Sequence, residues 1–591
     1  MARNRYDVDE VLETPFDFAH LKRSFVYIKK YKGKMITALV LSVFAAISGL
    51  LGPLITQYAL DNTIPQKNMG QLVLLTLAFV GPIAVSITFS TIRSRIMTVV
   101  GQDIIFDIRT DLFKHLQELP FEYYDNRPHG KILIRVVNYV NSVSDMLSNG
   151  IINVILECLN MLFIMIFMFF VNVKLSLVVL SGLPIFAVIM MMIKKRQRKA
   201  WQDVSNKSSN LNAYLQENIT GARVTQIFTR EEENAQIFDR LSEKYRKSWI
   251  NAVKYSNLVW PATDNVSTLV RAAIFVVGLL VLTPAAVSLG TIVAMTSYAS
   301  SFWQPIMNLS NIFNNFINNI AYLERIFETL DEPATIADKP NAQDIGDITG
   351  EVKFDDVTFS YEQGKTVLEH ISFDVKPGES VALVGPTGAG KSTVVSLLSR
   401  FYDLDSGKIT IDGKDISQAT LHSLRSQMGI MLQDSFIFSG TIYDNIRYGR
   451  LDATEEEIRE AAKIVCADEF INEMKDGYMT EVNERGSKLS GGQKQLISFA
   501  RTLLSDPKIL VLDEATSSID ARTEKLLQQG LQRLLVGRTS FIIAHRLSTI
   551  KNCDKIMYID NKGIAECGTH DQLIAKKGEY YKLYTAQHMD E

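Results

Sequence analysis

The sequence predicts two joined parts, an α-helical membrane bundle followed by a soluble α/β domain. Two observations carry this prediction. The first half holds six apolar runs, each near the roughly 20 residues that a helix needs to cross a bilayer. The second half alternates short apolar strands with helical patterns around a glycine-rich loop, GPTGAGKST, at residues 385–393.

The composition changes along the chain define four regions. We assign residues 1–34 to a polar, basic N-terminal segment, 35–330 to the membrane domain, 331–350 to a polar linker and 351–591 to the α/β domain. Within the first region, residues 16–34 mix aromatic and basic residues at helical spacing, which predicts a helix lying on the inner membrane surface.

The distribution of cations orients the bundle. Lysine and arginine cluster before the first span, after the second, after the fourth and before the fifth. The loops after the first, third and fifth spans hold only Lys67 and Lys174. By the positive-inside rule, both termini are predicted to be cytoplasmic in a multi-pass protein of the cell membrane. The predicted spans are 35–58, 71–92, 151–172, 175–193, 257–282 and 288–309.

Two inner segments, residues 93–150 and 194–256, are too long to be simple turns. Both keep helical periodicity, and their main breaks lie at LPFEYYDNRPHGK (119–131) and QENITGARV (216–224). Each segment is therefore predicted to be two helices that continue out of the membrane and meet at a short turn. About 25 helical residues would reach roughly 35–40 Å into the cytoplasm, so the tips need a surface to contact.

Charge and cysteine content exclude some classes of protein. A formal net charge of -3 gives no global basic field, so no nucleic-acid partner is expected. The four cysteines are scattered without a CxxC pair, which predicts reduced thiols and neither a zinc site nor a disulfide framework.

The glycine-rich loop has the strand before it and the helical pattern after it that a phosphate-binding loop requires. Backbone N–H groups would wrap a phosphate at the helix N-terminus. Lys391 would place a cation on the β- and γ-phosphates of ATP, and the Ser392 hydroxyl would bind Mg²⁺. The predicted ATP-binding residues of this loop are Gly385, Pro386, Thr387, Gly388, Ala389, Gly390, Lys391, Ser392 and Thr393.

Five further residues suit ATP chemistry. An apolar strand ends at Asp513, which could hold Mg²⁺ through water, and at Glu514, which could take a proton from the attacking water. His545 follows another apolar strand and could orient that water. Gln433 could sense Mg²⁺, and Tyr361 could stack on adenine. Alone, these residues could equally be a helix cap, a structural histidine, a loop amide or an exposed aromatic.

A second glycine-rich turn, KLSGGQKQ at 488–495, also leads into a helix but has no loop lysine. Ser490, Gly491, Gly492 and Gln493 would make a second anion site. This turn could bind something else, could only cap the helix, or could face the ATP of another copy. In the third case ATP holds a dimer together, and the Lys391 of the other copy supplies the cation.

The motifs of the second half, and their order along the chain, resemble those of the nucleotide-binding domain of ATP-binding cassette (ABC) transporters. The membrane half is similar to that of six-helix bacterial exporters, although Asn138 stands where their pattern often has an acid. The resemblance covers residues 16–588. It assigns Tyr361 to adenine stacking, Gly385–Thr393 to Walker A, Gln433 to the Q-loop, Leu489–Gln493 to the signature, Asp513–Glu514 to Walker B, Ser517–Asp520 to the D-loop and His545 to the switch histidine.

The resemblance implies a type IV exporter fold and a dimer of half-transporters, with ATP between the Walker A loop of one copy and the signature of the other. Because Glu514, His545 and the signature are intact, a homodimer with two competent sites is favoured over a heterodimer. The implied activity is ATP hydrolysis that drives export of an amphipathic drug or lipid by alternating access. An ATP-gated channel and a membrane-tethered ATPase are the alternatives.

Polar residues inside the spans suggest where a substrate could pass. A polar stripe at helical spacing should line water or bond to neighbouring helices. We expect its upper part to line a central cavity; the alternative is hydrogen bonding between helices, with the later asparagines in the cytoplasm. Glu157 could attract a cationic substrate or be structural, and Asp264 and Arg271 share one face of the fifth span. The stripe comprises Ser297, Ser301, Gln304, Asn308, Asn311, Asn315 and Asn318.

Overall fold

The computed structural model of the chain divides into two compact units. The helical unit comprises Met1–Gln117 and Pro128–Glu332, and the α/β unit comprises Glu118–Arg127 and Pro333–Glu591. A ten-residue piece of the membrane half therefore belongs to the α/β unit. The structure describes residues 18–125, 127, 129–281, 287–362, 364–431, 435–483, 486–513, 521–543 and 550–588.

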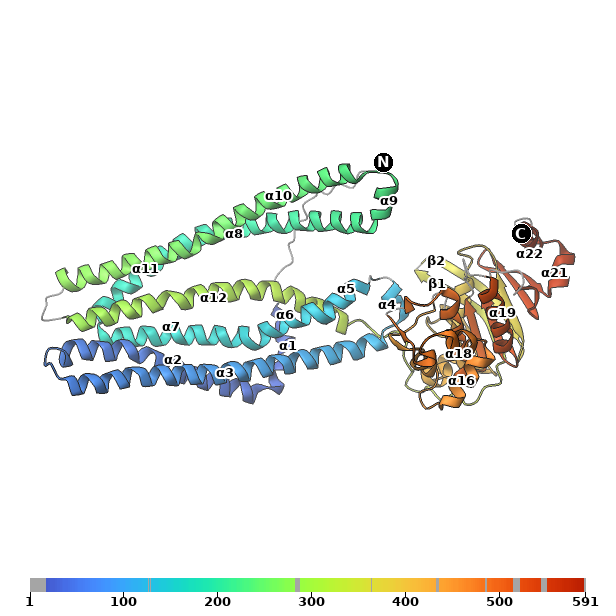
Figure 1. Cartoon of the computed structure of the whole chain (residues 1–591), viewed down its shortest axis with the longest axis horizontal. Coiled ribbons are helices and arrows are strands. Elements are labelled where there is room, and N and C mark those ends of the chain that lie inside the picture. The colour runs from blue at the N-terminus through green and yellow to red at the C-terminus, as the bar shows by residue number, and fades with distance from the viewer. Residues whose placement is uncertain are drawn as a thin grey trace. The chain divides into compact units, whose positions relative to one another are not determined.

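Long helices build the helical unit (Figure 1), and five of the six predicted spans each fall within one of them to within a residue. The fifth, 257–282, runs from the end of α10 through α11, and its last residue lies outside the described residues. Several continue far beyond a bilayer: α3 has 50 residues, about 75 Å of helix, against a hydrocarbon core of about 30 Å. The main helices are α1 (Phe18–Lys30), α2 (Lys32–Tyr58), α3 (Met69–Glu118), α7 (Ile151–Val171), α8 (Val173–Thr220), α10 (Glu231–Asn257), α11 (Val259–Val276) and α12 (Leu289–Leu330).

Short elements lie at the two predicted tips, which confirms the interpretation of both inner segments as helix pairs. In the second pair, α9 (Ala222–Ile227) joins α8 to α10 (Figure 1). In the first pair, α3 is followed by α4 (Phe121–Asp125), α5 (His129–Ile134) and α6 (Val140–Asp145), and the π-turns η2 (Arg135–Tyr139) and η3 (Met146–Gly150) flank α6 before α7 begins.

Five segments among the described residues are long and apolar enough to cross a membrane: 32–63, 69–118, 130–171, 173–220 and 231–280. The last of them includes α11 and all but the last residue of the π-turn η4 (Val277–Val281). The predicted sixth span lies in α12, which has the length but not the hydropathy, because serines, asparagines and a glutamine interrupt its apolar residues. The polar stripe is thus the reason that composition alone misses this helix.

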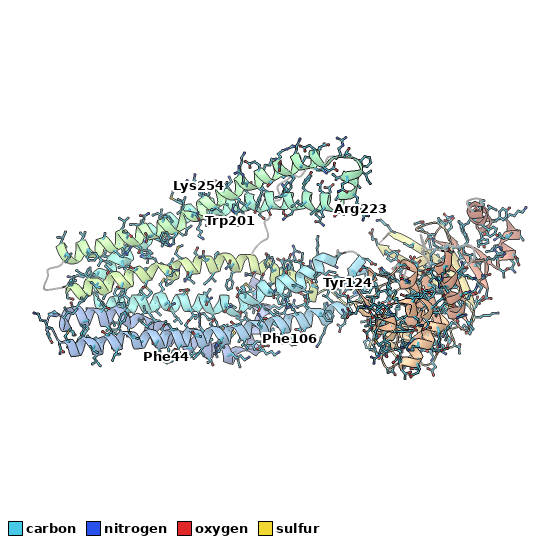
Figure 2. The ribbon with its side chains drawn as sticks, viewed as in Figure 1. Phe44, Phe106, Tyr124, Trp201, Arg223 and Lys254 are labelled. Atoms are coloured by element: carbon cyan, nitrogen blue, oxygen red, sulfur yellow. The ribbon has the colours of Figure 1, made fainter. Side chains whose placement is uncertain are left out.

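Buried aromatic residues hold the bundle together. Tyr298, Phe302 and Trp303 of α12 are almost fully buried among apolar residues of α7, α8 and α11. The Tyr298 hydroxyl donates a hydrogen bond to the carbonyl oxygen of Leu50 on α2 (2.6 Å). Apolar side chains such as Phe44 on α2 are instead exposed (Figure 2), as lipid-facing side chains are.

The α8–α10 pair is joined by its own side chains. The Trp201 indole N–H of α8 donates to the Ser256 hydroxyl of α10 (3.0 Å), and its ring contacts Trp249 edge-on with centroids 5.3 Å apart (Figure 2). Ala200, Val204 and Ala252 form a small buried cluster between the two helices. The pair is therefore a packed arm rather than two independent helices.

The predicted N-terminal helix forms as α1, and acidic residues of α3 bind it and the residues after it. Lys30 pairs with Asp107 at 2.8 Å and Lys34 pairs with Asp103 at 2.9 Å. The Tyr27 hydroxyl donates to Asp111 at 3.1 Å. The three aspartates are four residues apart, so they lie on one face of α3.

Two sheets form the core of the α/β unit. One sheet has the order β2 (Lys365–Val375), β1 (Val352–Glu362), β4 (Ser406–Ile411), β5 (Lys414–Asp415), and its pairs are antiparallel. In the larger sheet β12 is antiparallel and the other strands are parallel. Its order is β12 (Gly563–Gly568), β11 (Lys555–Asp560), β3 (Ser380–Val384), β10 (Thr539–Ile543), β9 (Ile509–Asp513), β6 (Met428–Met431).

The larger sheet separates two hydrophobic cores. Along β9, Ile509 and Val511 point into one core, and Leu510 and Leu512 point into the other, as alternation along a strand requires. Helix α13 (Lys391–Leu398) packs in the first core, and α18 (Gly491–Leu504) packs in the second. The helices that follow the two glycine-rich turns therefore cover opposite faces of the sheet.

The remaining elements surround these cores. A two-stranded ribbon pairs β7 (Gly440–Thr441) with β8 (Glu481–Val482). The other helices are α14 (Leu421–Arg425), α15 (Ile442–Arg447), α16 (Glu455–Ile464), α17 (Asp468–Glu473), α19 (Ala521–Leu535), α21 (His570–Lys576) and α22 (Glu579–His588), and η5 (Ile416–Gln418) and η6 (Gly477–Met479) are single 3₁₀ turns.

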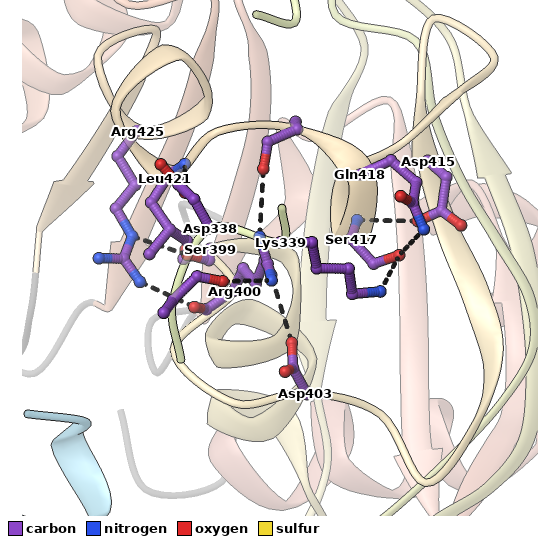
Figure 3. A network of polar contacts seen from close by, with 12 residues as sticks. Asp338, Lys339, Ser399, Arg400, Asp403, Asp415, Ser417, Gln418, Leu421 and Arg425 are labelled. Atoms are coloured by element: carbon purple, nitrogen blue, oxygen red, sulfur yellow. Dashed lines mark hydrogen bonds and ion pairs between the residues drawn. The ribbon is translucent and has the colours of Figure 1, made fainter. Parts of the chain in front are cut away.

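A buried arginine ties the predicted linker to the α/β unit (Figure 3). Arg400, which is 2% exposed, donates to the carbonyl oxygens of Ala337 and Ala419 (3.1 Å each). Nearby, the Asp338 carboxylate accepts the backbone N–H of Leu421 (2.7 Å). The linker therefore packs along the segment that follows α13.

The C-terminal end of α2 and the N-terminal end of α12 are joined through one carboxylate. Asp61, in the π-turn η1 (Ala59–Thr63), accepts the backbone N–H of Gly290 (2.9 Å) and the hydroxyl of Ser288 (2.5 Å). A β-carbon on Gly290 would lie 2.6 Å from the Gln57 carbonyl oxygen and from the Asp61 carboxylate. This close approach requires glycine at position 290.

We expect Gly290→Ala to destabilise the protein because the added methyl forces α2 and α12 apart. Overpacking of this kind costs about 1–3 kcal/mol. The measurement is the apparent melting temperature of the purified protein in detergent. Gly81→Ala is the matched control, because its β-carbon would meet nothing within 4 Å and alanine favours helix. Equal melting temperatures for the two variants would contradict the expectation.

Candidate functional site

Glycines allow the backbone of the loop between β3 and α13 to turn tightly. Gly385, Gly388 and Gly390 have φ angles of 145°, 82° and 102°, a region that other residues rarely adopt. A β-carbon would lie 2.2 Å from the Ile559 carbonyl oxygen at position 385. At position 390 it would lie 2.7 Å from the Leu368 side chain. The backbone can therefore turn its N–H groups inward, as an anion cradle requires.

Lys391 brings a buried cation to this loop. It is the first residue of α13, it is 9% exposed, and its Nζ donates to the carbonyl oxygens of Gly385 and Pro386 at 2.9 Å each. Burial lowers the pKa of the Lys391 ammonium, and the Asp513 carboxylate opposes part of this shift. A cation and free N–H groups at a helix N-terminus suit the phosphates of ATP.

Tyr361 lies beside the same helix. Its hydroxyl shares a hydrogen bond with the Thr393 hydroxyl of α13 (3.1 Å). Its ring meets the rings of Phe359 and Tyr402 edge-on, with centroids 4.8 and 5.1 Å away. The side chain is still 43% exposed, which leaves surface on which a base could stack.

Asp513 is the last residue of β9, and Ile543, the last residue of β10, pairs with both Asp513 and Leu383. Parallel strands in this register end at one edge of the sheet, the edge from which the loop at 385–390 leaves β3. The structure therefore brings Tyr361, the loop, Lys391 and Asp513 together. Gln433, Glu514, Asp520 and His545 lie outside the described residues, and their roles stay predictions.

The second glycine-rich turn forms the N-terminus of α18. The Ser490 hydroxyl accepts the backbone N–H of Gln493 (3.3 Å), and the Gln493 side chain accepts the backbone N–H of Ser490 (3.0 Å). This reciprocal pair is a capping box. Ser490 and Gly491 remain exposed, and a β-carbon on Gly491 would meet nothing within 4 Å. The turn therefore caps α18 and still leaves an exposed helix N-terminus.

Sequence reasoning missed the residues that bind α4. Phe121 packs on Phe401 with ring centroids 4.3 Å apart, and the Tyr402 hydroxyl donates to the Asp125 carboxylate at 2.8 Å. Burial and this hydrogen bond raise the pKa of the Tyr402 phenol. The only sequence signal was an aromatic pair soon after the Walker A helix, which fits many structural roles.

Residues of α2, α3, α7 and α12 line an open polar cavity of about 460 Å³ in the helical unit. Asn308, Asn311 and Asn315 of the predicted stripe line it, and Asn308 donates to the Glu157 carboxylate (2.7 Å). The stripe therefore lines a polar pocket, but through its lower part rather than through the upper part that the sequence predicted.

The upper part of the stripe differs from the prediction. Ser297 and Ser301 donate to carbonyl oxygens one turn earlier in α12, and Gln304 donates to Asn308 (3.0 Å). These three residues, Asp264 and Arg271 are not among the described residues that line the cavity. The Asn318 side chain lies outside the described residues. Hydroxyls bond back to their own helix because lipid offers no partner.

Comparisons with known proteins agree with this geometry. Residues 35–306 match the family model of the ABC transporter transmembrane region, and residues 368–517 match that of the ABC transporter ATP-binding region, described as "ABC transporter". The "uncharacterized ABC transporter ATP-binding protein YknV" of Bacillus subtilis is 41% identical over 590 residues, which cover 100% of this chain and 98% of that protein.

Two further similarities extend along most of the chain. A fatty acid ABC transporter ATP-binding/permease protein of Mycobacterium bovis is 37% identical over 84% of this chain and 78% of its own length. A solved structure of a bacterial Atm1-family ABC exporter with ATP bound superposes with a TM-score of 0.79 at 28% identity. The match covers 94% of this chain and 98% of that chain.

We expect Tyr361→Phe to preserve ATP affinity and Tyr361→Ala to weaken it about 5–150-fold, because base–aromatic stacking contributes about 1–3 kcal/mol. The measurement is equilibrium binding of Mg²⁺–ATP to the full-length protein. The phenylalanine variant is the control for the lost hydrogen bond to Thr393. If both variants bind ATP like the wild type, the ring does not contact adenine.

Proposed function

This chain belongs to the ABC transporter family, and from that premise we propose that it exports amphipathic small molecules or lipids across the cytoplasmic membrane as a homodimer. The protein is a multi-pass exporter whose transport is coupled to ATP hydrolysis, as its fused membrane and ATP-binding regions indicate. The observation that carries the proposal is the Lys391 cradle in the same chain as a membrane bundle with a polar cavity.

We assign the nucleotide roles as follows. The loop at 385–393 holds the phosphates, and Tyr361 stacks on adenine. Ser392, Asp513 and Gln433 hold Mg²⁺, which when bound would neutralise charge on the transferred phosphoryl group. Glu514 takes the proton of the attacking water, and His545 orients that water.

The opposite placement of α13 and α18 supports a dimer. The exposed N-terminus at Ser490 belongs to a helix on the other face of the sheet from the Walker A helix. A partner is therefore the natural source of a phosphate for this exposed helix N-terminus. In the proposed homodimer, Ser490, Gly491, Gly492, Gln493 and Asp520 of each copy complete the site of the other.

The path of the chain supports coupling between hydrolysis and transport. The chain enters the α/β unit at Glu118 and leaves it at Arg127, so the ends of this segment continue as α3 and α5. Phe401 and Tyr402, which hold the segment, follow closely after α13. A shift of α13 on ATP binding would thus reach the membrane helices through covalent bonds, and alternating access follows as a population shift.

The same path supports the orientation. Because α4 belongs to the α/β unit, the tip of the first inner segment lies on the side of the membrane where ATP is available. The cation clusters agree, so we place both termini in the cytoplasm. The name of the mycobacterial relative supports a lipid or another amphiphile as substrate.

We expect the chain expressed alone to purify with the mass of two copies and to hydrolyse ATP. Vesicles that contain it should accumulate an amphipathic dye against a gradient when ATP is supplied. Glu514→Gln should bind ATP but lose about 10²–10⁴-fold of the hydrolysis rate, because the general base is removed. The measurements are mass in detergent, phosphate release and dye uptake.

Each alternative gives a different result. A channel would dissipate a dye gradient, and a membrane-tethered ATPase would release phosphate without moving dye. One half of a heterodimer, expressed alone, would show neither the mass of two copies nor ATP hydrolysis. Any of these outcomes would contradict the homodimeric exporter.

We expect Asp125→Ala to reduce the stimulation of ATPase by transported dye several-fold while basal hydrolysis persists. The substitution removes the acceptor of the Tyr402 hydrogen bond, worth about 1.5–3 kcal/mol to a charged group, and leaves the contact between Tyr402 and Tyr361 in place. Glu118→Ala, an exposed acid at the end of α3, is the control. Equal stimulation in both variants would exclude a coupling role for this hydrogen bond.

A further inference from the structure

The cavity of the helical unit contains two charges of opposite sign. Arg93 of α3 and Glu157 of α7 both line it, together with five asparagines and three serines. No ion pair joins Arg93 to Glu157 within 4.0 Å among the described residues. Isolated charges within membrane helices are costly, and they mark functional sites when no partner neutralises them.

Arg93 has a neutral partner. One nitrogen of its guanidinium is 3.5 Å from the side-chain oxygen of Asn153, at the limit of a hydrogen bond. A guanidinium has five N–H donors, so most of its capacity is available to an anion. The fork geometry of arginine suits a phosphate or carboxylate in particular.

Glu157 also has a neutral partner. One carboxylate oxygen accepts the Asn308 amide at 2.7 Å, and an ionised carboxylate has about four acceptor positions. The amide orients the carboxylate without cancelling its charge. A cationic group in the cavity would therefore meet an oriented, half-buried anion.

Glu157 and the neighbour of Arg93 lie close together on α7. Asn153, the partner of Arg93, and Glu157 are four residues apart, so they lie on one face of the helix with a rise of about 6 Å between them. Asn160 extends the same face by one more turn and also lines the cavity. A ligand that satisfies both sites must carry a cation and an anion about one helical turn apart.

We propose that this cavity binds the zwitterionic head group of an amphipathic substrate, with its anionic group on Arg93 and its ammonium group on Glu157. The proposal rests on the exporter function proposed above and names the substrate class. The amides of Asn308, Asn311 and Asn315 supply further hydrogen bonds to the head group. The apolar lining residues Ala45, Ala46, Leu156 and Ile312 leave room for the start of an acyl chain.

The full-length protein in a nonionic maltoside detergent tests the proposal. Three twelve-carbon probes below their micellar concentrations differ only in head group: dodecylphosphocholine, laurate and dodecyltrimethylammonium. We measure binding by calorimetry and the concentration that half-stimulates ATPase. The wild type should bind dodecylphosphocholine at least tenfold more tightly than either singly charged probe. Equal binding of the three probes would overturn the proposal without any variant.

Variants then assign each charge. Arg93→Gln should weaken dodecylphosphocholine and laurate at least tenfold but not dodecyltrimethylammonium. Glu157→Gln should weaken dodecylphosphocholine and dodecyltrimethylammonium but not laurate. Arg95→Gln is the matched control, because Arg95 is exposed on the same helix and is not among the residues that line the cavity. This variant should bind the probes and hydrolyse ATP like the wild type. If Arg95→Gln changes probe binding as Arg93→Gln does, the proposal fails.

A purely structural role for the two charges gives a different pattern. Both single variants would then lower the melting temperature and weaken all three probes equally, and the exchanged pair Arg93→Glu with Glu157→Arg would restore stability and all binding. Because phosphate and ammonium are ordered along the acyl chain, the exchange should not restore dodecylphosphocholine binding if the proposal holds. If the wild type transports dye but binds the three probes equally, this inference is refuted and the proposed exporter function still holds.

Discussion

One short segment of the membrane half, residues 118–127, is held inside the α/β unit, and the rest of the molecule depends on that constraint. Phe121 packs on Phe401, and Asp125 accepts the hydrogen bond of Tyr402. An aromatic contact contributes about 0.5–1.5 kcal/mol beyond its burial and a hydrogen bond to a charged group about 1.5–3 kcal/mol, so a few interactions hold the segment. Because α3 precedes the segment and α5 follows it, the chain itself joins the segment to the membrane helices.

The residues that hold this segment are themselves fixed from the nucleotide side. Tyr402 contacts Tyr361, whose hydroxyl is bonded to Thr393 of the Walker A helix. On the other side, Arg425 lies over the Phe401 ring, and its side chain donates to the carbonyl oxygens of Ser399 and Arg400. The packed rings and the arginine contacts leave residues 399–402 little freedom to deform independently. These residues should therefore move with α13.

Much of the fold follows from local patterns, and so does the part of the site that one loop builds. The six apolar runs predicted the spans, the periodicity of 93–150 and 194–256 predicted the paired arms, and the glycines at 385, 388 and 390 predicted the loop that their positive φ angles now explain. The stripe on α12 was predicted to line a cavity through its upper part and lines one through its lower part, because periodicity defines a helix face but not which stretch of that face the neighbouring helices leave open. The partners of α4 gave no signal, since an aromatic pair fits many positions.

The sequence by itself determined which segments cross the membrane, where the phosphate loop lies and which residue types could serve ATP. These properties depend on about 5–25 neighbouring residues, where helix pitch, strand alternation and glycine φ angles act directly. Only the tertiary structure decided that α13 and α18 cover opposite faces of one sheet, and that Asn308 meets Glu157 across 151 residues of chain. Such contacts form when distant segments pack together, and the energy that selects them comes from burial of whole helices rather than from any local pattern.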